Sequence, residues 1–255
     1  MKKIKLSNLI APSFYKVHEN LKEERYTHYW LKGGRGSTKS SFVSIEIVLG
    51  MMQDPQANAI ILRKVGKYLK DSVYEQLIWA IEKLGVSEFW HVTKSPLEII
   101  YIPTGQKILF RGADEPRKIK STKFSKGYAK YIWYEEVDEF NGMEEIRTIN
   151  QSLMRGGSGF VAFYSFNPPQ SIRNWVNTGL LDKRPDRLVH HSTYLDVPKH
   201  WLGEPFIIEA DHLKKVNERA YRHEYLGEVT GTGGEIFTNV TVREITNEEI
   251  ARFDR

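Results

Sequence analysis

The octapeptide GGRGSTKS at residues 33–40 constrains the fold of this chain more than any other feature of its sequence. It stands between a strand-like run at 26–32, YTHYWLK, and an apolar stretch at 41–52, SFVSIEIVLGMM. A strand, a glycine-rich turn and a helix in this order match the phosphate-loop pattern G-x-x-x-x-G-K-[ST]. Gly33, Lys39 and Ser40 fit that pattern, whereas Thr38 occupies the place of its last glycine.

The residue types in this turn suit the binding of phosphate. Glycines let backbone N–H groups turn inward around phosphate oxygens, and the helix that follows points its positive end at the same place. Lys39 can reach the β- and γ-phosphates of a nucleotide, and Ser40 can ligate Mg²⁺. An ordinary glycine turn is the weaker alternative. The predicted nucleotide-binding residues are Gly33, Gly34, Arg35, Gly36, Ser37, Thr38, Lys39, Ser40 and Ser41.

Two adjacent acids, Glu135 and Glu136, follow the β-rich run YAKYIWY at 128–134. A phosphate-loop site that hydrolyses nucleotide needs one carboxylate beside the metal and another that activates water. We assign Glu135 to the metal, although most such motifs use Asp, and Glu136 to the general base. Neighbouring residues of a strand point to opposite sides, so we expect the two carboxylates to take different roles. The alternative is a helix start enriched in acids.

Three further polar residues are candidates for the same site. Arg35 lies inside the loop, where it can stabilise charge in the transition state; its alternative role is a salt bridge to a neighbouring carboxylate. Ser165 and Asn167 end a predicted strand at 159–166. Ligands bind at the carboxyl ends of parallel strands, so these two side chains can sense the γ-phosphate. A simple turn at Asn167-Pro168 is about as consistent with the sequence.

Composition excludes several other kinds of site. The chain of 255 residues has no cysteine, which removes disulfides, thiolate zinc sites, iron–sulfur clusters and cysteine nucleophiles. No apolar run approaches the ~18–20 residues of a membrane span. The net charge of +5 is matched by residues 111–130 alone, which hold seven basic and two acidic residues. This basic segment indicates either a local contact with a polyanion or a solvated, mobile loop.

The order of predicted elements indicates an α/β fold. Strand-like runs alternate with helical ones, which implies a mostly parallel sheet covered by helices on both faces. Strands are predicted at 26–32, 58–63, 97–102, 107–111, 128–134, 159–166 and 187–194, and helices at 41–52, 69–84, 143–153 and 203–226. We place the core domain at 1–195, a small helical appendage at 196–230 and a linker at 231–255.

Several of these segments together resemble the large subunit of phage terminases, with the PBSX-type branch the most similar. They are GGRGSTKSSF, ILRKVG at 61–66, SPLEIIYIPTGQKILFRGAD at 95–114, IWYEEVDEF and FNPP. The resemblance extends over roughly residues 10–240 and implies a packaging ATPase with a P-loop fold of the ASCE type. It assigns Lys39 and Ser40 to nucleotide and Mg²⁺, and Glu135 and Glu136 to the acidic pair. It also matches Arg35 to the basic residue that such loops carry. Residues 165–167, which include Ser165 and Asn167, match a motif that couples hydrolysis to motion, and Phe14 and Tyr15 are suggested to lie near adenine.

The same resemblance implies a function and partners. The protein is expected to be an ATP-hydrolysing motor subunit that moves double-stranded DNA into a viral procapsid in the host cytoplasm, with ATP and Mg²⁺ as cofactors. The implied partners are DNA, a portal protein, a small terminase subunit and further copies of this chain in a ring. Arg111 and Arg117 are candidates for an arginine that acts on the neighbouring subunit. The nuclease domain of the family is not recognised before Arg255, so we expect an ATPase fragment.

Two other functions fit the sequence. A P-loop kinase of a small metabolite or nucleotide would need an acceptor pocket and lids instead of a water-activating glutamate. A nucleotide-gated DNA-binding module with little turnover is kept open by Thr38 and by the glutamate at position 135.

Overall fold

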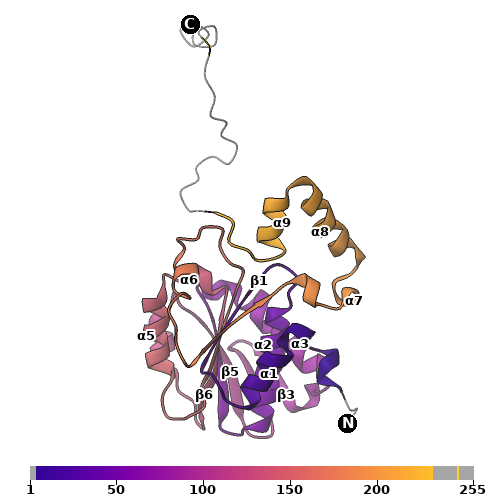
Figure 1. The fold of residues 1–255 in the computed structure, drawn as a ribbon. Coiled ribbons are helices and arrows are strands. Elements are labelled where there is room, and N and C mark those ends of the chain that lie inside the picture. The colour runs from indigo at the N-terminus through magenta and orange to yellow at the C-terminus, as the bar shows by residue number, and fades with distance from the viewer. Residues whose placement is uncertain (1–3, 232–245, 247–255) are drawn as a thin grey trace.

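The computed structural model describes residues 4–231 and 246, and these are organised around one eight-stranded sheet (Figure 1). The strands lie in the order β3-β4-β5-β2-β6-β7-β1-β8. Those from β5 to β8 in this order are parallel, and β4 and β3 extend the sheet as antiparallel neighbours. The strands are β1 (His28–Gly33), β2 (Ala57–Arg63), β3 (Trp90–Lys94), β4 (Leu97–Tyr101), β5 (Gln106–Gly112), β6 (Tyr128–Glu135), β7 (Val161–Phe166) and β8 (Arg187–Ser192).

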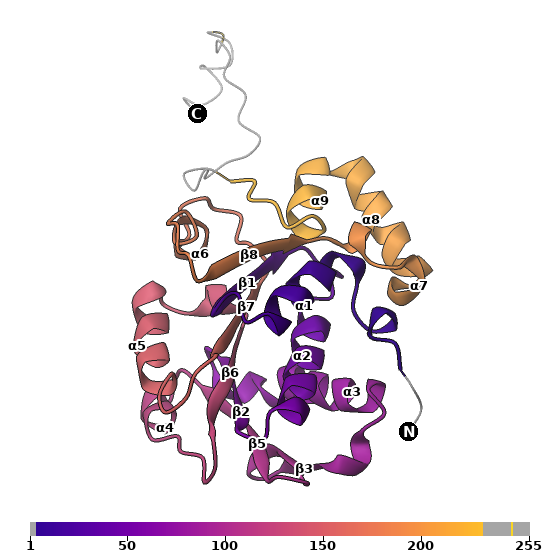
Figure 2. The same ribbon diagram turned by 60° about the horizontal axis from the view of Figure 1, so that its bottom comes forward.

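Helices cover the sheet on both faces, as the sequence predicts (Figures 1 and 2). One layer contains α1 (Tyr15–Lys22), α2 (Lys39–Gln53) and α3 (Glu75–Lys83), and the other contains α4 (Pro116–Lys120), α5 (Met143–Leu153) and α6 (Trp175–Thr178). The helices α7 (Lys199–Leu202), α8 (Glu204–Val216) and α9 (Glu218–Glu224) lie together at the carboxyl end of β1. Within residues 4–231 no helix has the length and apolar character needed to cross a membrane.

The strand β6 illustrates why the sheet is buried on both faces. Its side chains alternate between the two helical layers, with Tyr131 and Trp133 in the core beneath α2 and Ile132 and Tyr134 in the core beneath α5. Since both faces are covered, the strand is a nearly continuous apolar run instead of an alternating one. This pattern is what made the parallel strands recognisable in the sequence.

The position of β7 determines the layout of the site. It lies between β1, which leads into the phosphate loop, and β6, which leads into the two glutamates. The carboxyl ends of these three parallel strands therefore meet at one edge of the sheet. This inserted strand agrees with the expected ASCE-type arrangement.

Some elements differ from the sequence-based expectation. The helix predicted at 69–84 is present, but its first part, Lys70–Tyr74, is a π-helical turn before α3. The strand β3 was not predicted, because four of its five residues are polar or exposed. The basic segment 111–130 is not a simple mobile loop, since α4 forms within it and buries Ile119 against α5.

The C-terminal helices form a small unit with its own apolar contacts. Tyr194, just after β8, packs against Phe206 and Tyr225, and its hydroxyl lies 2.9 Å from the hydroxyl of Tyr221. The chain then returns to the main body, where Gly231 pairs with Ser171. The linker predicted at 231–255 lies outside the described residues, apart from positions 231 and 246.

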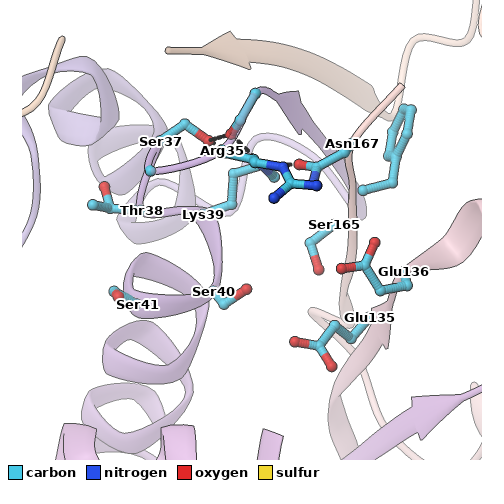
Figure 3. Close-up of a pocket in the computed structure, with 13 residues that line it drawn as sticks. Arg35, Ser37, Thr38, Lys39, Ser40, Ser41, Glu135, Glu136, Ser165 and Asn167 are labelled. Carbon is cyan, nitrogen blue, oxygen red and sulfur yellow. Dashed lines mark hydrogen bonds between the residues drawn. The ribbon is translucent and has the colours of Figure 1, made fainter. Parts of the chain in front are cut away.

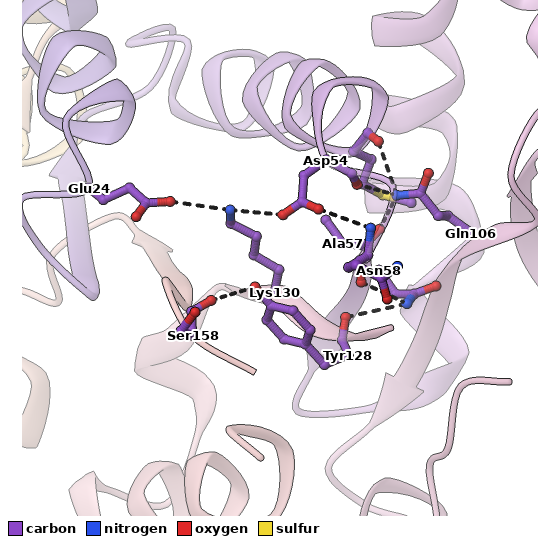
Figure 4. A network of polar contacts seen from close by, with 10 residues as sticks. Glu24, Asp54, Ala57, Asn58, Gln106, Tyr128, Lys130 and Ser158 are labelled. Atoms are coloured by element: carbon purple, nitrogen blue, oxygen red, sulfur yellow. Dashed lines mark hydrogen bonds and ion pairs between the residues drawn. The ribbon is translucent and has the colours of Figure 1, made fainter. Parts of the chain in front are cut away.

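A polar network fastens the opposite edge of the sheet (Figure 4). Asn58, 1% exposed at the start of β2, donates from Nδ2 to the carbonyls of Lys126 (2.9 Å) and Tyr128 (3.3 Å). Its Oδ1 accepts the backbone N–H of Lys107 at 2.8 Å. One side chain thus joins β2, β5 and the segment that enters β6, which fixes the base of the basic segment.

Two neighbours extend this network. The amide of Gln106 donates to the carbonyls of Met51 (3.0 Å), Asp54 (2.8 Å) and Ala57, and so ties the end of α2 to β5. The ammonium of Lys130 lies 3.0 Å from Asp54 and 3.3 Å from Glu24. These contacts hold α2, and with it the phosphate loop at its other end, in a fixed position against the sheet.

We predict that Asn58→Ala lowers the free energy of unfolding by about 2–4 kcal/mol, because it leaves the Lys107 N–H and the Lys126 carbonyl without their partner. Urea unfolding followed by far-UV circular dichroism measures this. The exposed residue Asn8 provides the control, since Asn8→Ala should change stability by less than about 0.5 kcal/mol. Equal stability of the two variants would contradict the structural role of Asn58.

Candidate functional site

The phosphate loop and the ends of β6 and β7 enclose a cavity of about 200 Å³ (Figure 3). The cavity thus gathers residues that lie more than one hundred positions apart in the chain. It is lined by Gly34, Arg35, Gly36, Ser37, Thr38, Lys39, Ser40, Ser41, Glu135, Glu136, Ser165, Phe166 and Asn167. Every predicted nucleotide, metal, acid and coupling residue is among them except Gly33, which ends β1 immediately before the loop.

Thr38, the departure from the phosphate-loop pattern, adopts a left-handed backbone conformation with φ of +60°. A glycine takes this conformation freely, whereas a residue with a Cβ pays about 1–2 kcal/mol for it. The loop therefore keeps the left-handed turn before Lys39 despite the substitution. Residues held in strained conformations of this kind cluster at functional sites.

Lys39 is folded back into the phosphate loop. Its Nζ donates to the carbonyls of Gly33 (3.0 Å) and Gly34 (3.3 Å), to the Ser37 hydroxyl (2.9 Å) and to Oδ1 of Asn167 (2.9 Å). Burial lowers the pKa of Lys39 to about 8. None of its four acceptors carries a full charge, so an anion that enters the cavity would be strongly favoured beside it.

The two glutamates face the same cavity, which corrects the expectation that they point to opposite sides. Glu135 is the last residue of β6, but Glu136 has already left the strand with φ of +48°. This left-handed turn swings the Glu136 carboxylate toward Lys39 and Ser165, while that of Glu135 points toward Ser40 (Figure 3). Burial raises the pKa of Glu135 to about 7, and it also raises the pKa of Glu136.

Arg63, at the end of β2, is a site residue that the sequence reasoning missed. Its Nε lies 3.7 Å from Oε2 of Glu135, and both side chains are only 12–13% exposed. Its other nitrogens lie 3.4 Å from Glu139 and from the Ser72 hydroxyl, and its guanidinium stacks over Tyr68. Arg63 lowers the pKa of Glu135 against the larger effect of burial. It therefore helps to keep Glu135 ionised and fixed in direction.

The residues predicted to hold Mg²⁺ fit that ion. The Ser40 hydroxyl and the Glu135 carboxylate face each other across the cavity (Figure 3), and Oε2 of Glu135 is buried with no hydrogen-bond partner. Mg²⁺ is bound through one or two protein oxygens together with phosphates and waters. Among the described residues, no group of three or more histidine, aspartate or glutamate side chains is placed to hold a metal ion without other ligands.

The C-terminal helices pack directly on the phosphate loop. The Arg35 N–H donates to the Glu224 carbonyl at 2.8 Å, and a Cβ on Gly36 would lie 2.5 Å from the Phe206 ring. The Arg35 side chain is 68% exposed, and its Nε lies 4.0 Å from the Glu224 carboxylate. Arg35 thus lines the cavity rim with an acidic neighbour within reach, a position that suits both roles considered for it.

Ser165 and Asn167, the two residues predicted to have a coupling role, line the cavity. The Ser165 hydroxyl accepts from the Trp133 indole at 2.8 Å, and Asn167 accepts from Lys39. These contacts connect β7 to β6 on one side and to the phosphate loop on the other. A movement of the Lys39 ammonium would therefore break its hydrogen bond to Asn167 at the end of β7.

Four other predicted residues, Phe14, Tyr15, Arg111 and Arg117, do not line the cavity. Phe14 is fully buried and stacks on Phe42 with ring centroids 4.4 Å apart, so it is not available to adenine. Arg111 is half-buried on β5, and Arg117 is exposed on α4. The resemblance suggested Phe14 near adenine, and the burial of Phe14 in the core beneath α2 does not fit that role.

Comparisons with known proteins agree with this geometry. A family model described as phage terminase large subunit matches residues 25–228. The large terminase subunit of Bacillus phage SPP1 is 43% identical over 262 residues, which cover 100% of this chain and 61% of that protein. The PBSX phage terminase large subunit of Bacillus subtilis (strain 168) is 28% identical over 214 residues, which cover 77% of this chain and 48% of that protein.

A solved structure shows the same fold. The large terminase of a thermophilic bacteriophage superposes with a TM-score of 0.65 at 14% identity, and the match covers 86% of this chain and 53% of that one. A second structure of that terminase, in complex with ADP, gives a TM-score of 0.63 at 15% identity with the same coverage. The chain spans about half to three-fifths of the length of these relatives.

We predict that Glu135→Gln stabilises the nucleotide-free protein at pH 8 and not at pH 4. Because burial raises the folded-state pKa from 4.5 to about 7, the folded wild type loses stability as the pH rises through this window. Glutamine removes that loss, so the free energy of unfolding should rise by about 1–3 kcal/mol at pH 8. Urea unfolding in EDTA at the two pH values measures the difference.

The exposed acid Glu144 supplies the control, since Glu144→Gln should show no such dependence on pH. A stability difference between wild type and Glu135→Gln that is the same at both pH values would contradict the assigned burial of the charge.

Proposed function

This chain belongs to the phage terminase large subunit family, and on that premise we propose that its phosphate-loop site hydrolyses ATP to drive the packaging of double-stranded viral DNA. One observation carries the proposal: Lys39, Glu135 and Glu136 line a single cavity at the carboxyl ends of β1, β7 and β6. Phosphoryl transfer to water needs a cation on the terminal phosphates, an acid beside the metal and an acid beside the water.

The phosphate loop holds the nucleotide in this account. The backbone of residues 33–41 surrounds the phosphates at the start of α2, and Lys39 exchanges neutral acceptors for charged phosphate oxygens. Ser40 and Glu135 would hold Mg²⁺. That ion, when bound, would neutralise charge on the phosphates. Arg63 is a positioning residue that keeps the Glu135 carboxylate in place.

Glu136 is the proposed general base. Its left-handed turn places the carboxylate on the cavity side of β6, near Lys39 and Ser165 (Figure 3). Burial raises its pKa, which brings a carboxylate closer to the range in which it can accept a proton at neutral pH. Arg35 at the rim is the candidate for stabilising the charge that develops on the terminal phosphate.

Asn167 and Ser165 are proposed to couple hydrolysis to motion. Asn167 occupies one of the four acceptor positions of Lys39. A terminal phosphate would compete with Asn167 for that ammonium, so the end of β7 would be free with nucleotide and held without it. Gly231 pairs with Ser171 only four residues beyond Asn167, which gives this motion a route to the C-terminal part of the chain.

The proposed assembly follows the family. We propose residues 1–195 as the ATPase core, 196–230 as a helical subdomain and 231–255 as a linker. The partners are double-stranded DNA, a portal protein, a small terminase subunit and further copies of this chain in a ring, in the host cytoplasm. Of the two arginines considered for action on a neighbouring subunit, Arg117 is exposed on α4 and is the better candidate.

Lys39→Ala is predicted to weaken ATP binding and to remove hydrolysis, because it deletes the cation that faces the terminal phosphates. Phosphate release with and without duplex DNA measures turnover, and a fluorescent ATP analogue measures binding. The exposed residue Lys83 on α3 gives a matched control, and Lys83→Ala should leave both unchanged. Wild-type turnover by Lys39→Ala would refute the phosphate-loop assignment.

Glu136→Gln should bind ATP as the wild type does but lose about 10²–10⁴-fold in turnover, the usual contribution of a positioned base. Single-turnover hydrolysis and analogue binding are compared in the same preparation. If Glu135→Gln instead bound normally and failed to turn over, while Glu136→Gln remained active, the two roles would be reversed.

A further inference from the structure

A cavity of about 320 Å³ lies on the sheet away from the phosphate loop, and none of its lining residues belongs to a helix. Its floor is formed by β4 and β5, and residues 123–125 of the basic segment form one wall. Leu109 pairs with Ile60 of β2, whose side chain packs in the α5 layer, so the cavity opens on the α5 side of the sheet. Glu135 of the first site lies on the other side, because it follows Trp133 by two residues on β6 and Trp133 packs in the α2 layer.

The cavity is lined by three cations, Lys107, Arg111 and Lys123, against a single carboxylate, Glu98. Both oxygens of Glu98 lie 3.2 Å from the ammonium of Lys107, so these two side chains form an ion pair. Within residues 4–231 neither Arg111 nor Lys123 forms an ion pair, although the carboxylates of Glu98 and Glu115 act on Arg111 from a greater distance. Two of the three cations therefore have no directly paired carboxylate among the described residues.

Arg111 is the most unusual of these cations. It is half-buried, and burial lowers its pKa. Its Nη1 donates to the carbonyl of Phe110 at 2.8 Å, which is a neutral acceptor. A desolvated guanidinium gains most from a charged acceptor with two oxygens, and its fork geometry matches a phosphate.

The surroundings favour a phosphate that belongs to a polymer. Lys126 is exposed three residues beyond Lys123, and Lys120 is exposed on the preceding α4, whereas Lys118 of that helix is paired with Glu115. Several exposed cations close in sequence to the cavity suit a backbone with regularly spaced charges. Phe124 provides an apolar wall beside the cations, against which a sugar can pack.

We propose that the cavity formed by Lys107, Arg111 and Lys123 binds one backbone phosphate of duplex DNA. The inference rests on the proposed function for the identity of its partner, and it locates a contact that is separate from the ATP site. It assigns Arg111 to DNA instead of to the neighbouring subunit.

The test is the binding of a fluorescently labelled 30-base-pair duplex to the full chain without nucleotide, by anisotropy, from 50 to 300 mM NaCl. Arg111→Gln should weaken binding about tenfold at the lowest salt concentration. It should reduce the slope of log affinity against log salt by about 0.9, the value for one phosphate contact. Lys123→Gln should have a similar effect on the slope.

The double variant gives the sharper result. Since both side chains contact the same phosphate, Arg111→Gln with Lys123→Gln should still reduce the slope by about 0.9 in total. A loss near 1.8 would mean two independent contacts and would overturn the single subsite. Lys183→Gln removes one exposed charge from the loop before β8 and should change neither affinity nor slope.

Further measurements separate folding, ligand source and interface. Arg111→Lys keeps the charge and should keep the slope, and unchanged unfolding midpoints would show that the variants are folded. Inorganic phosphate at constant ionic strength should compete only weakly with the duplex. If the protein bound inorganic phosphate tightly through Arg111 but did not bind duplex, the proposal would be overturned. Wild-type duplex affinity in Arg111→Gln would also overturn the proposal. If ATP hydrolysis by assembled motors fell in that variant while duplex affinity stayed the same, Arg111 would be an interface residue.

ATP hydrolysis is measured separately on the same variants. If the wild type binds duplex through Arg111 but releases no phosphate from ATP, the subsite stands and the proposed function fails. If hydrolysis is normal and duplex binding is independent of Arg111, or absent, the subsite alone fails.

Discussion

Lys39 holds a positive charge at the base of the phosphate loop with 8% of its surface exposed, and two parts of the chain supply the oxygens around it. Residues 33–37 provide two backbone carbonyls and the Ser37 hydroxyl, and the segment just after β7 provides the Asn167 amide oxygen. A buried cation without a carboxylate partner is costly, and polar neighbours offset only part of this. In the nucleotide-free site, neutral oxygens of the protein therefore occupy positions around Lys39 that phosphate oxygens would take in the proposed complex.

Backbone strain accompanies this arrangement at two positions. Thr38 and Glu136 both have left-handed conformations that favour glycine, and they flank the cavity from the phosphate loop and from the end of β6. Each turn sends the functional group at that point into the cavity, Lys39 in the first case and the Glu136 carboxylate in the second. The surrounding sheet supports both turns, because β1 and β6 are each paired on two sides.

The sequence predicted the elements that depend on local pattern. Buried runs such as 58–63 and 128–134 indicated strands, and the glycine loop located Lys39 and Ser40. The sequence could not predict contacts that depend on the pairing register of distant strands. Arg63 contacts Glu135 only because Leu62 of β2 pairs with Tyr134 of β6. The turn at Glu136 was missed for a different reason, since no glycine marks it. Likewise, helix α4 was missed because its charged residues hide the single buried side chain of Ile119.

The most direct test of the central claim is a crystal structure of this chain with a non-hydrolysable ATP analogue. We predict that the phosphates lie in the loop of residues 33–41 and that the Lys39 ammonium exchanges Asn167 for an oxygen of the terminal phosphate. The Glu136 carboxylate should then face the far side of that phosphate. Phosphates bound away from the loop, or a Lys39 that keeps its 2.9 Å contact with Asn167 beside a bound triphosphate, would contradict it.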